Sequence, residues 1–259
     1  MQKLKPAILV LNALAVAATQ SIIAPQPKAE AKDSTPTVLE LFTSEGCSSC
    51  PSADALLSAL ARRNSNNMIV LSEHVDYWNY LGWKDPHSSP VFSERQKHYV
   101  SALHSSSVYT PQLVINGSVE SVGNNPEAVE QALTSQSKSQ LSTLNINAIA
   151  NSTDQNVTVE FDSIPEMKKS PFVVNIAFVR DFTSSRVTRG ENQGRTLTHT
   201  NVVTKLISLN CAPTARRMKL SVSGDLSKER MIVFLQKPQY GQIFAVGVKP
   251  SVRISEQKT

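Results

Sequence analysis

The hydrophobic positions of the chain follow two different periods, and the first period occupies residues 37–136. There, short apolar runs alternate with stretches in which apolar residues recur every three or four positions, which indicates buried strands and amphipathic helices. The predicted elements are a strand at 38–42, a helix over 53–61, a strand at 68–71, a helix at 91–103, a hairpin over 112–122 and a helix at 126–133. This β-α-β-α-β-β-α order predicts an α/β domain.

From Leu141 onward the period changes to two. Apolar and polar residues alternate in seven short runs separated by Pro, Gly, Asn and Ser: 144–148, 157–161, 172–178, 202–206, 218–222, 231–235 and 243–248. Short strands at such regular spacing predict an all-β sandwich. The Ser-rich stretch 134–142 marks the junction, so the two predicted domains cover residues 36–138 and 141–252.

The N-terminal residues have the layout of a secretory signal peptide. Lys3 and Lys5 precede an apolar stretch at 7–18, and small residues follow as far as Ala31. The apolar stretch is too short to span a bilayer, although an uncleaved anchor stays open as an alternative. We therefore expect residues 1–31 to be removed, and the protein to be periplasmic or secreted with no stable membrane insertion.

Composition and charge exclude several classes of protein. The chain has 259 residues, enough for one large domain or two modest ones, and 40% of them are hydrophobic, which excludes a disordered chain. Three cysteines are too few for a disulfide-rich scaffold. The net charge is 26 − 21 = +5, and the predicted leader carries +2 of it. Because no basic run occurs, we expect no nucleic-acid partner.

The sequence Cys47-Ser-Ser-Cys50 lies between a predicted strand and a predicted helix, which is the context of a redox motif. Backbone N–H groups and the positive end of the helix dipole favour a thiolate at a helix start. We predict Cys47 as the exposed attacking thiol and Cys50 as the buried resolving thiol, exchanging through a mixed disulfide. The partner would be a protein or a small thiol, with no cofactor beyond the redox-active disulfide.

Other roles for the pair stay open. Export favours oxidation, so Cys47 and Cys50 could form a static disulfide, and the protein could then be a non-enzymatic envelope binding module. Soft thiolates select Cu(I), which the pair could hold together with His74 or His199. Zinc would need two more ligands, and no second pair at finger-like spacing is present. The leading interpretation includes no metal.

Thr110-Pro111 directly precedes the predicted hairpin. In sequence order with the cysteine motif, this position predicts a cis peptide bond that faces the cysteine pair, and cis X–Pro bonds cost little. Such a bond would expose the Thr110 backbone to an extended substrate. The alternative is an ordinary proline at the start of an edge strand.

Residues 74–86 concentrate histidine, aspartate and aromatic side chains. His74 directly follows a predicted strand, so His74 or Asp76 could relay protons to Cys50. The only two tryptophans of the chain, Trp78 and Trp83, lie here as well. We expect these tryptophans to pack a structural loop, with a substrate platform as the alternative.

The second half holds a polar cluster and the third cysteine. Arg195, Thr196, His199 and Asn201 form the cluster. A surface loop is the simpler interpretation. The alternative is that the loop docks near Cys47, with Arg195 and His199 making the interdomain contact. Cys211 is predicted to be a buried apolar thiol, or else an intermolecular bridge.

Several long motifs resemble one family of secreted bacterial proteins with a thioredoxin-like domain, known as domain of unknown function 1223. The motifs lie at 39–54, 74–86, 108–112 and 190–203. The resemblance implies a thioredoxin-like first domain and a periplasmic setting, but no activity. Strongly oxidising periplasmic enzymes often carry a histidine where this chain has Ser48-Ser49, and the charge of Glu45 opposes a thiolate. We therefore expect a mild redox centre.

Overall fold

The computed structural model describes residues 35–63, 67–151, 156–213, 215, 217–221, 228–250 and 253–255. The predicted signal peptide at 1–31 lies outside these residues. Within the described part of the chain, no helix is both long enough and apolar enough to cross a membrane.

The first half folds in the predicted β-α-β-α-β-β-α order. Its elements are β1 (Thr37–Thr43), α1 (Cys50–Arg63), β2 (Met68–His74), the 3-10 turn η1 (Asn79–Leu81), α2 (Pro90–Ala102), β3 (Gln112–Ile115), β4 (Val119–Val122) and α3 (Pro126–Ser135). Local chemistry sets the helix starts: Ser89 and Asn125 cap α2 and α3 by accepting hydrogen bonds from backbone N–H groups, and a proline follows each cap.

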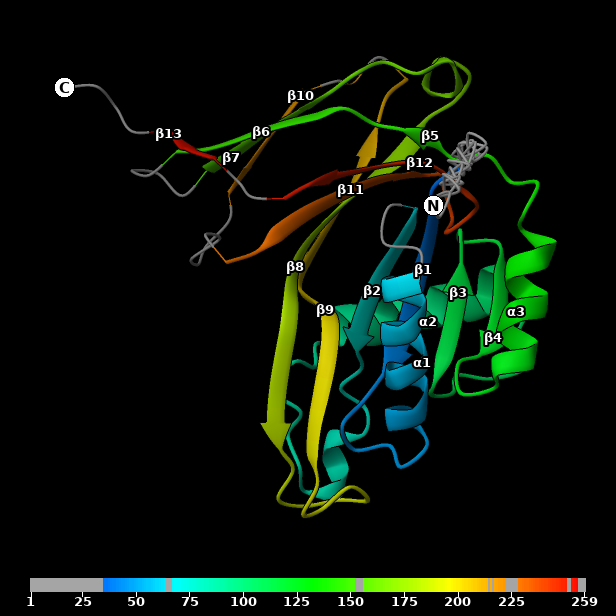
Figure 1. The fold of residues 1–259 in the computed structure, drawn as a ribbon. Helices are drawn as coiled ribbons and strands as arrows, with labels where there is room; N and C mark the ends of the chain where they lie inside the picture. The colour runs from blue at the N-terminus through cyan, green and yellow to red at the C-terminus, as the bar shows by residue number, and fades with distance from the viewer. Residues whose placement is uncertain are drawn as a thin grey trace, which may run out of the picture. The chain divides into compact units, whose positions relative to one another are not determined.

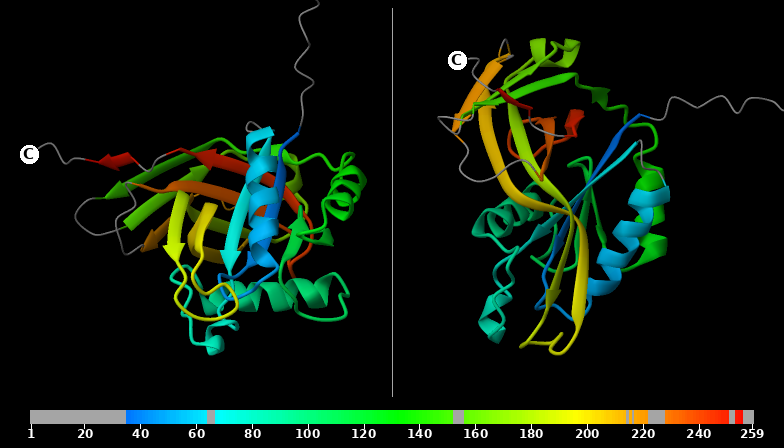
Figure 2. Two further views of the ribbon diagram at one scale, coloured as in Figure 1. Left: turned by 60° about the horizontal axis from the view of Figure 1, so that its bottom comes forward. Right: turned by 60° about the vertical axis from the view of Figure 1, so that its left-hand side comes forward.

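The helices of this half lie on both faces of its strands. Leu39 and Leu41 of β1 pack against α1 and α3, whereas Val38 and Phe42 face α2 and the chain around it. This division follows from the alternation of side chains along a strand. Figure 2 (right) shows α1 and α3 on one side of the strands and α2 on the other.

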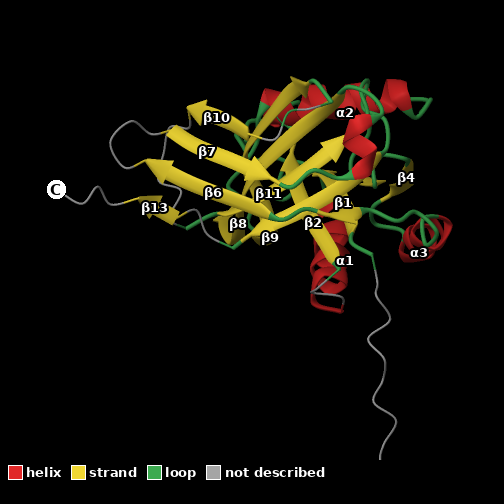
Figure 3. Cartoon of the chain, turned by 90° about the horizontal axis from the view of Figure 1, so that it is seen from above, coloured by secondary structure: helices red, strands yellow, loops and turns green. Residues whose placement is uncertain are grey.

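The second half is built almost entirely of strands, as its period of two predicted. Its elements are β5 (Ser142–Thr143), β6 (Ile146–Asn151), β7 (Asn156–Phe161), the 3-10 turn η2 (Pro165–Lys168), β8 (Phe172–Arg186), β9 (Thr196–Cys211), β10 (Arg217–Ser221), β11 (Arg230–Gln236), β12 (Ile243–Lys249) and β13 (Arg253–Ser255). One sheet has the order β10-β7-β6-β13, and these strands lie side by side in Figure 3. Apolar residues of β6 to β8, β11 and β12 form the core beneath it.

One large curled sheet crosses the predicted junction between the halves. Its order is β4-β3-β1-β2-β9-β8-β11-β12-β5, and β2 pairs with β9 in parallel at Ser72 and Val202. The strands β8 and β9 are 15 and 16 residues long, much longer than their apolar runs, and reach down beside β2 (Figure 1). The fold is therefore mixed α/β with strands of both halves in a shared sheet, while the domain boundaries stay a prediction.

Candidate functional site

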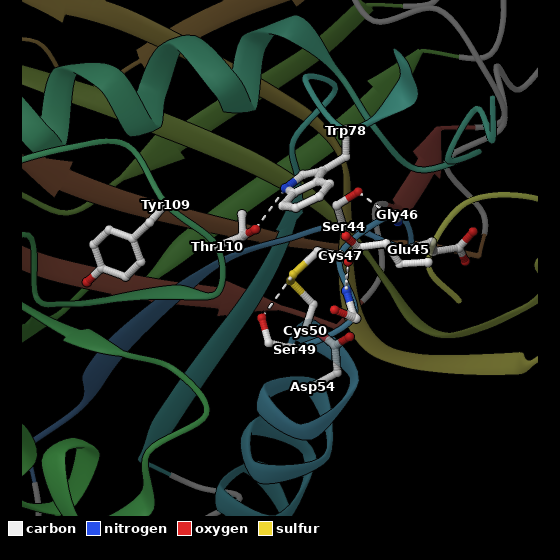
Figure 4. The surroundings of a disulfide bond; sticks show 12 residues. Ser44, Glu45, Gly46, Cys47, Ser49, Cys50, Asp54, Trp78, Tyr109 and Thr110 are labelled. Carbon is white, nitrogen blue, oxygen red and sulfur yellow. Dashed lines mark hydrogen bonds between the residues drawn. A yellow bond between two sulfur atoms is a disulfide. The ribbon is translucent and has the colours of Figure 1, made fainter. Parts of the chain in front are cut away.

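The Cys47–Cys50 pair forms a disulfide at the start of α1 (Figure 4). Cys50 is the first residue of the helix, and Cys47 lies in the turn between β1 and α1. The Cys50 N–H donates to the Cys47 carbonyl at 3.2 Å, and the Cys47 N–H donates to the Ser44 carbonyl at 3.2 Å. These two bonds hold the segment as a compact turn, which we call the cysteine turn (residues 44–50).

The structure corrects the prediction that Cys47 is exposed. Cys47 is 1% exposed and Cys50 is fully buried, although the intervening Ser48 and Ser49 are exposed. The connection between β8 and β9 lies against the cysteine turn and adds to the burial that the strand, turn and helix provide.

That connection, residues 187–195, is called here the hairpin tip. The Asn192 side chain is 1% exposed, and its Nδ2 donates to the carbonyls of Glu45 and Cys47, both at 2.9 Å. Glu191 Oε2 accepts from the backbone N–H of Ser48 at 2.9 Å. Hydrogen bonds from the side chain and backbone of Ser48 lower the pKa of Glu191. The hairpin tip thus binds both the buried and the exposed parts of the cysteine turn.

The sequence singled out Arg195 in this region but missed Glu191 and Asn192. Arg195 Nη1 donates to Asn192 Oδ1 at 2.8 Å, so among the described residues it braces Asn192 and does not itself bond to the first half. The flanking Gly190 and Gly194 were the available signal for a tight polar tip. The sequence offered docking near Cys47 as an alternative, but through Arg195 and His199 and not through the two missed residues.

Thr110 and Trp78 lie beside the disulfide on another side (Figure 4). Trp78 Nε1 donates to Thr110 Oγ1 at 2.8 Å, and the Thr110–Pro111 peptide bond is cis, as the sequence predicted. Ser49 Oγ lies 3.4 Å from Cys47 Sγ. The hydroxyls of Ser49 and Thr110 and the indole of Trp78 therefore lie beside the disulfide.

Three histidines lie close together beside the cysteine turn. Their ring centroids are 4.6 Å apart for His74 and His199, 5.2 Å for His74 and His87, and 6.0 Å for His87 and His199. His74 and His199 are buried. These three residues, with the carboxylates of Glu45, Asp54 and Asp85, are called here the histidine cluster.

Each carboxylate of the histidine cluster contacts an imidazole. Asp85 Oδ2 lies 2.7 Å from His74 Nδ1, and His199 lies between Glu45 (3.1 Å from Nε2) and Asp54 (3.3 Å from Nδ1). His199 comes from β9, whereas Glu45 lies in the cysteine turn and Asp54 in α1. The second half thus places a titratable group against the start of α1.

The environment shifts the pKa values of these groups in opposite directions. Burial alone would lower the pKa of His199, but its ion pair with Asp54 and its hydrogen bond with Glu45 outweigh burial and raise that pKa to about 9. For Asp85, burial is outweighed by the charge and hydrogen bond of His74, and the pKa falls to about 2. Burial and the neighbouring His74 lower the pKa of His87. At neutral pH, His199 is therefore an imidazolium held between two carboxylates.

The remaining predicted site residues lie elsewhere or make other contacts. Asp76 Oδ1 accepts from Ser93 Oγ at 2.5 Å, so this carboxylate braces the start of α2 and is not part of the histidine cluster. Trp83 Nε1 donates to Glu45 Oε2 at 2.8 Å. Cys211 is half-buried against the core of the second half, and burial raises the pKa of its thiol.

The structure holds no ready metal centre in the part of the chain that it describes. Among those residues, no group of three or more His, Cys, Asp or Glu side chains is placed to hold a metal ion. The two thiols that the copper hypothesis requires are joined to each other.

Fold and site together define a mixed α/β protein with a buried Cys-Ser-Ser-Cys disulfide, in a turn that a hairpin from the other half binds. The chain belongs to the family described as protein of unknown function (DUF1223), whose model matches residues 38–236. The family predicted from the sequence motifs is thereby confirmed. The crystal structure of protein AGR_C_4864 from Agrobacterium tumefaciens is similar: it shares 25% sequence identity with a TM-score of 0.67, and covers 88% of this chain and 100% of its own.

Two smaller structures match part of the chain. The fibronectin type III domain of human collagen alpha-1(XX) chain is 12% identical and covers 45% of this chain and 84% of its own, with a TM-score of 0.23. A domain of the outer membrane lipoprotein Omp28 from Porphyromonas gingivalis is 15% identical and covers 44% and 97%, also with a TM-score of 0.23. These scores are too low to support an argument. No curated protein matches the chain.

Proposed function

We propose that this protein is an exported thiol–disulfide oxidoreductase that acts through Cys47 and Cys50. The observation that carries the proposal is the placement of the pair: Cys50 opens α1, and Cys47 lies in the turn before it. Unpaired backbone N–H groups and the helix dipole stabilise a thiolate at such a position. The signal-peptide layout of residues 1–31 supports export.

We also propose that residues 36–138 have a thioredoxin-like fold. The strand order β4-β3-β1-β2 supports this, with β2 parallel to β1 and β3 antiparallel to it. So does the location of the cysteine pair between β1 and α1, with Thr110 beside the disulfide. Thr110 and Pro111 would then form one wall of the substrate groove.

The proposed reaction has two exchange steps. In the reduced protein, the Cys47 thiolate attacks one sulfur of a substrate disulfide, forming a mixed disulfide and releasing the other sulfur as a thiolate. Cys50 then loses its proton and attacks Cys47 Sγ, which releases the second substrate thiolate and restores the Cys47–Cys50 disulfide. The substrate gains two electrons and the protein loses two. In reverse, a substrate dithiol is oxidised while the pair is reduced.

The surroundings of the pair suit a mild redox centre. Burial alone would raise the pKa of Glu45, but the hydrogen bond from His199 lowers it, so Glu45 stays ionised near Cys47 and opposes thiolate formation. The positive charge of His199 offsets this carboxylate. The Ser49 hydroxyl, 3.4 Å from Cys47 Sγ, can donate to the thiolate. The partner is a protein or a small thiol.

The test is a redox titration of the protein without residues 1–31, in a Cys211→Ser background so that only one pair reacts. The folded protein should equilibrate with a glutathione buffer and exchange with a peptide disulfide. The Cys50→Ser variant should accumulate a mixed disulfide at Cys47, and Cys47→Ser should accumulate none there. A pair that does not equilibrate with thiol buffers and does not exchange would be a static disulfide, and the proposal would fail.

A further inference from the structure

The disulfide is buried, although the two residues between its cysteines are exposed. Cys47 is 1% exposed, while Ser48 and Ser49 between the two cysteines are exposed. Exchange needs an attacking sulfur to reach one of the two protein sulfur atoms, and access is one of the factors that set its rate. Trp78 and Thr110 lie beside the sulfur atoms, and the hairpin tip binds the backbone of the cysteine turn. One of these groups must therefore move before the proposed reaction can begin.

Asn192 of the hairpin tip makes the buried contact with the cysteine turn. Both of its Nδ2 bonds, to the carbonyls of Glu45 and Cys47, flank the attacking residue directly. Glu191 adds a bond from outside, to the Ser48 N–H. Hydrogen bonds from two side chains thus fix the hairpin tip to the cysteine turn.

Most residues of the hairpin tip are exposed to solvent. Between residues 188 and 195, only Asn192 is buried, and the ladder of the hairpin ends at the bonds between Val187 and Gly194 and between Val187 and Arg195. Gly190 and Gly194 have φ values of 77° and 84°, and such residues change backbone conformation at little steric cost. With Val187, the hairpin tip has two buried side chains, and segments with so few belong to the least stable parts of a fold.

We propose that the hairpin tip is a gate over the Cys47–Cys50 disulfide. In the docked state Asn192 and Glu191 hold it on the cysteine turn and exclude thiols from the pair; in the open state Cys47 becomes accessible to a substrate. The role of the gate in regulating exchange rests on the proposed function. The effect of the gate on access does not, because any small reductant can report it.

The experiment measures the rate at which dithiothreitol reduces the folded protein, followed by maleimide labelling in the Cys211→Ser background. In the protein with an unchanged hairpin tip, dithiothreitol should reduce the Cys47–Cys50 disulfide at least about a hundredfold more slowly than it reduces oxidised glutathione. The reason is that exchange rates depend on access to the sulfur atoms. Asn192→Ala and the isosteric Asn192→Asp should each accelerate reduction at least about tenfold, because two hydrogen bonds are lost.

Gln193→Ala is the matched control, because Gln193 is exposed at the same tip and its side chain makes no hydrogen bond among the described residues. It should leave the rate unchanged. The gate is refuted if the Asn192 variants react within twofold of the control, or if the unmodified tip leaves the disulfide as reactive as oxidised glutathione. The second comparison needs no variant at Asn192, so it holds even if those variants fold poorly.

The two proposals fail separately. If the Asn192 variants speed reduction but no variant exchanges with a peptide disulfide, the gate stands and the oxidoreductase proposal fails. If the pair exchanges with a peptide disulfide and the Asn192 variants change nothing, the gate alone fails.

Discussion

Two buried polar clusters lie on opposite faces of β1 and β2. The histidine cluster lies on the side of α1, next to the disulfide. The second, called here the arginine cluster, lies on the side of α2 and consists of Arg95, Glu40, Glu73, Tyr99 and Gln236. Glu73 and His74 are neighbours in β2 yet belong to different clusters, because successive side chains of a strand point to opposite faces.

The arginine cluster carries a charge that stays fixed. Arg95 is 3% exposed, and its Nη2 lies 2.6 Å from Glu40 Oε1, while Tyr99 donates to Glu40 Oε2 at 2.6 Å. Burial would lower the pKa of Arg95, but the charge of Glu40 outweighs it and raises that pKa. Burial and the charge of Glu40 raise the pKa of Glu73 well above its usual value.

The histidine cluster carries a charge that can be lost. Both clusters join the two halves of the chain, through Gln236 of β11 in one case and His199 of β9 in the other. The pKa of His199, about 9, lies within reach of ordinary buffers, whereas that of Arg95 does not. Of these two clusters, the arginine cluster therefore keeps its charge, whereas the histidine cluster can lose its charge beside the disulfide.

The largest expected effect on the free energy of unfolding comes from breaking the arginine cluster. Arg95→Met leaves the buried Glu40 carboxylate without its partner, which should cost about 3–5 kcal/mol of unfolding free energy. Urea unfolding measures this loss. Lys97→Met is the control on the same helix: its pair with Glu94 is exposed, so it should cost less than about 0.5 kcal/mol. Equal losses in the two variants would contradict the comparison.

The next effect is a loss of stability with rising pH. The folded pKa of His199 is about 9 and its unfolded value is 6.5, so its stabilisation is complete below pH 6.5 and is lost as pH rises through 9. The loss should reach at most about 3.5 kcal/mol, since one pKa unit corresponds to about 1.4 kcal/mol. Urea unfolding of the wild type and of His199→Gln between pH 6 and 9.5 checks this, and equal slopes for both proteins would overturn it.

Asp85 should produce a smaller effect in acid. Its folded pKa of about 2 lies below the unfolded value of 3.8, so its stabilisation is present above pH 3.8 and is lost as pH falls through 2. Asp85→Asn should therefore cost about 2 kcal/mol at pH 7 and flatten the acid limb of the stability curve. If the variant loses stability in acid as steeply as the wild type, the acid limb has another cause.

The smallest effect concerns the thiolate itself. Ser49→Ala removes the hydroxyl that lies 3.4 Å from Cys47 Sγ, so the reduced protein should hold less thiolate. Alkylation of Cys47 at pH 7 should slow by about threefold, because the thiolate is the reactive form. Ser48→Ala serves as the neighbouring control. An unchanged alkylation rate for Ser49→Ala would show that the hydroxyl does not act on the thiolate.

Much of the local structure could be predicted from the sequence. The hydrophobic periods predicted the order of elements in the first half and the strands of the second, and the Cys47–Cys50 motif falls at the predicted strand–helix turn. His74 and His199 were singled out, and they meet in the histidine cluster. These features depend on neighbouring residues, so they can be read from short stretches of chain.

Other features could not be read in this way. The polar ends of β8 and β9 have no apolar alternation, so their extension beside β2 was missed, and with it the burial of Cys47. Arg95 looks like a surface residue of an amphipathic helix until Glu40 is placed opposite it. Asn192 has no local feature that marks it as a buried contact.

The sequence by itself determined the two hydrophobic periods, the redox-type motif at a helix start and the candidate export signal, because each depends on residues close together in the chain. Only the tertiary structure decided that the two halves share a sheet, that a hairpin binds the cysteine turn and that His199 lies between Glu45 and Asp54. Those contacts join residues more than a hundred positions apart. They depend on how the strands pair and how long they run, and no local pattern of residues encodes that.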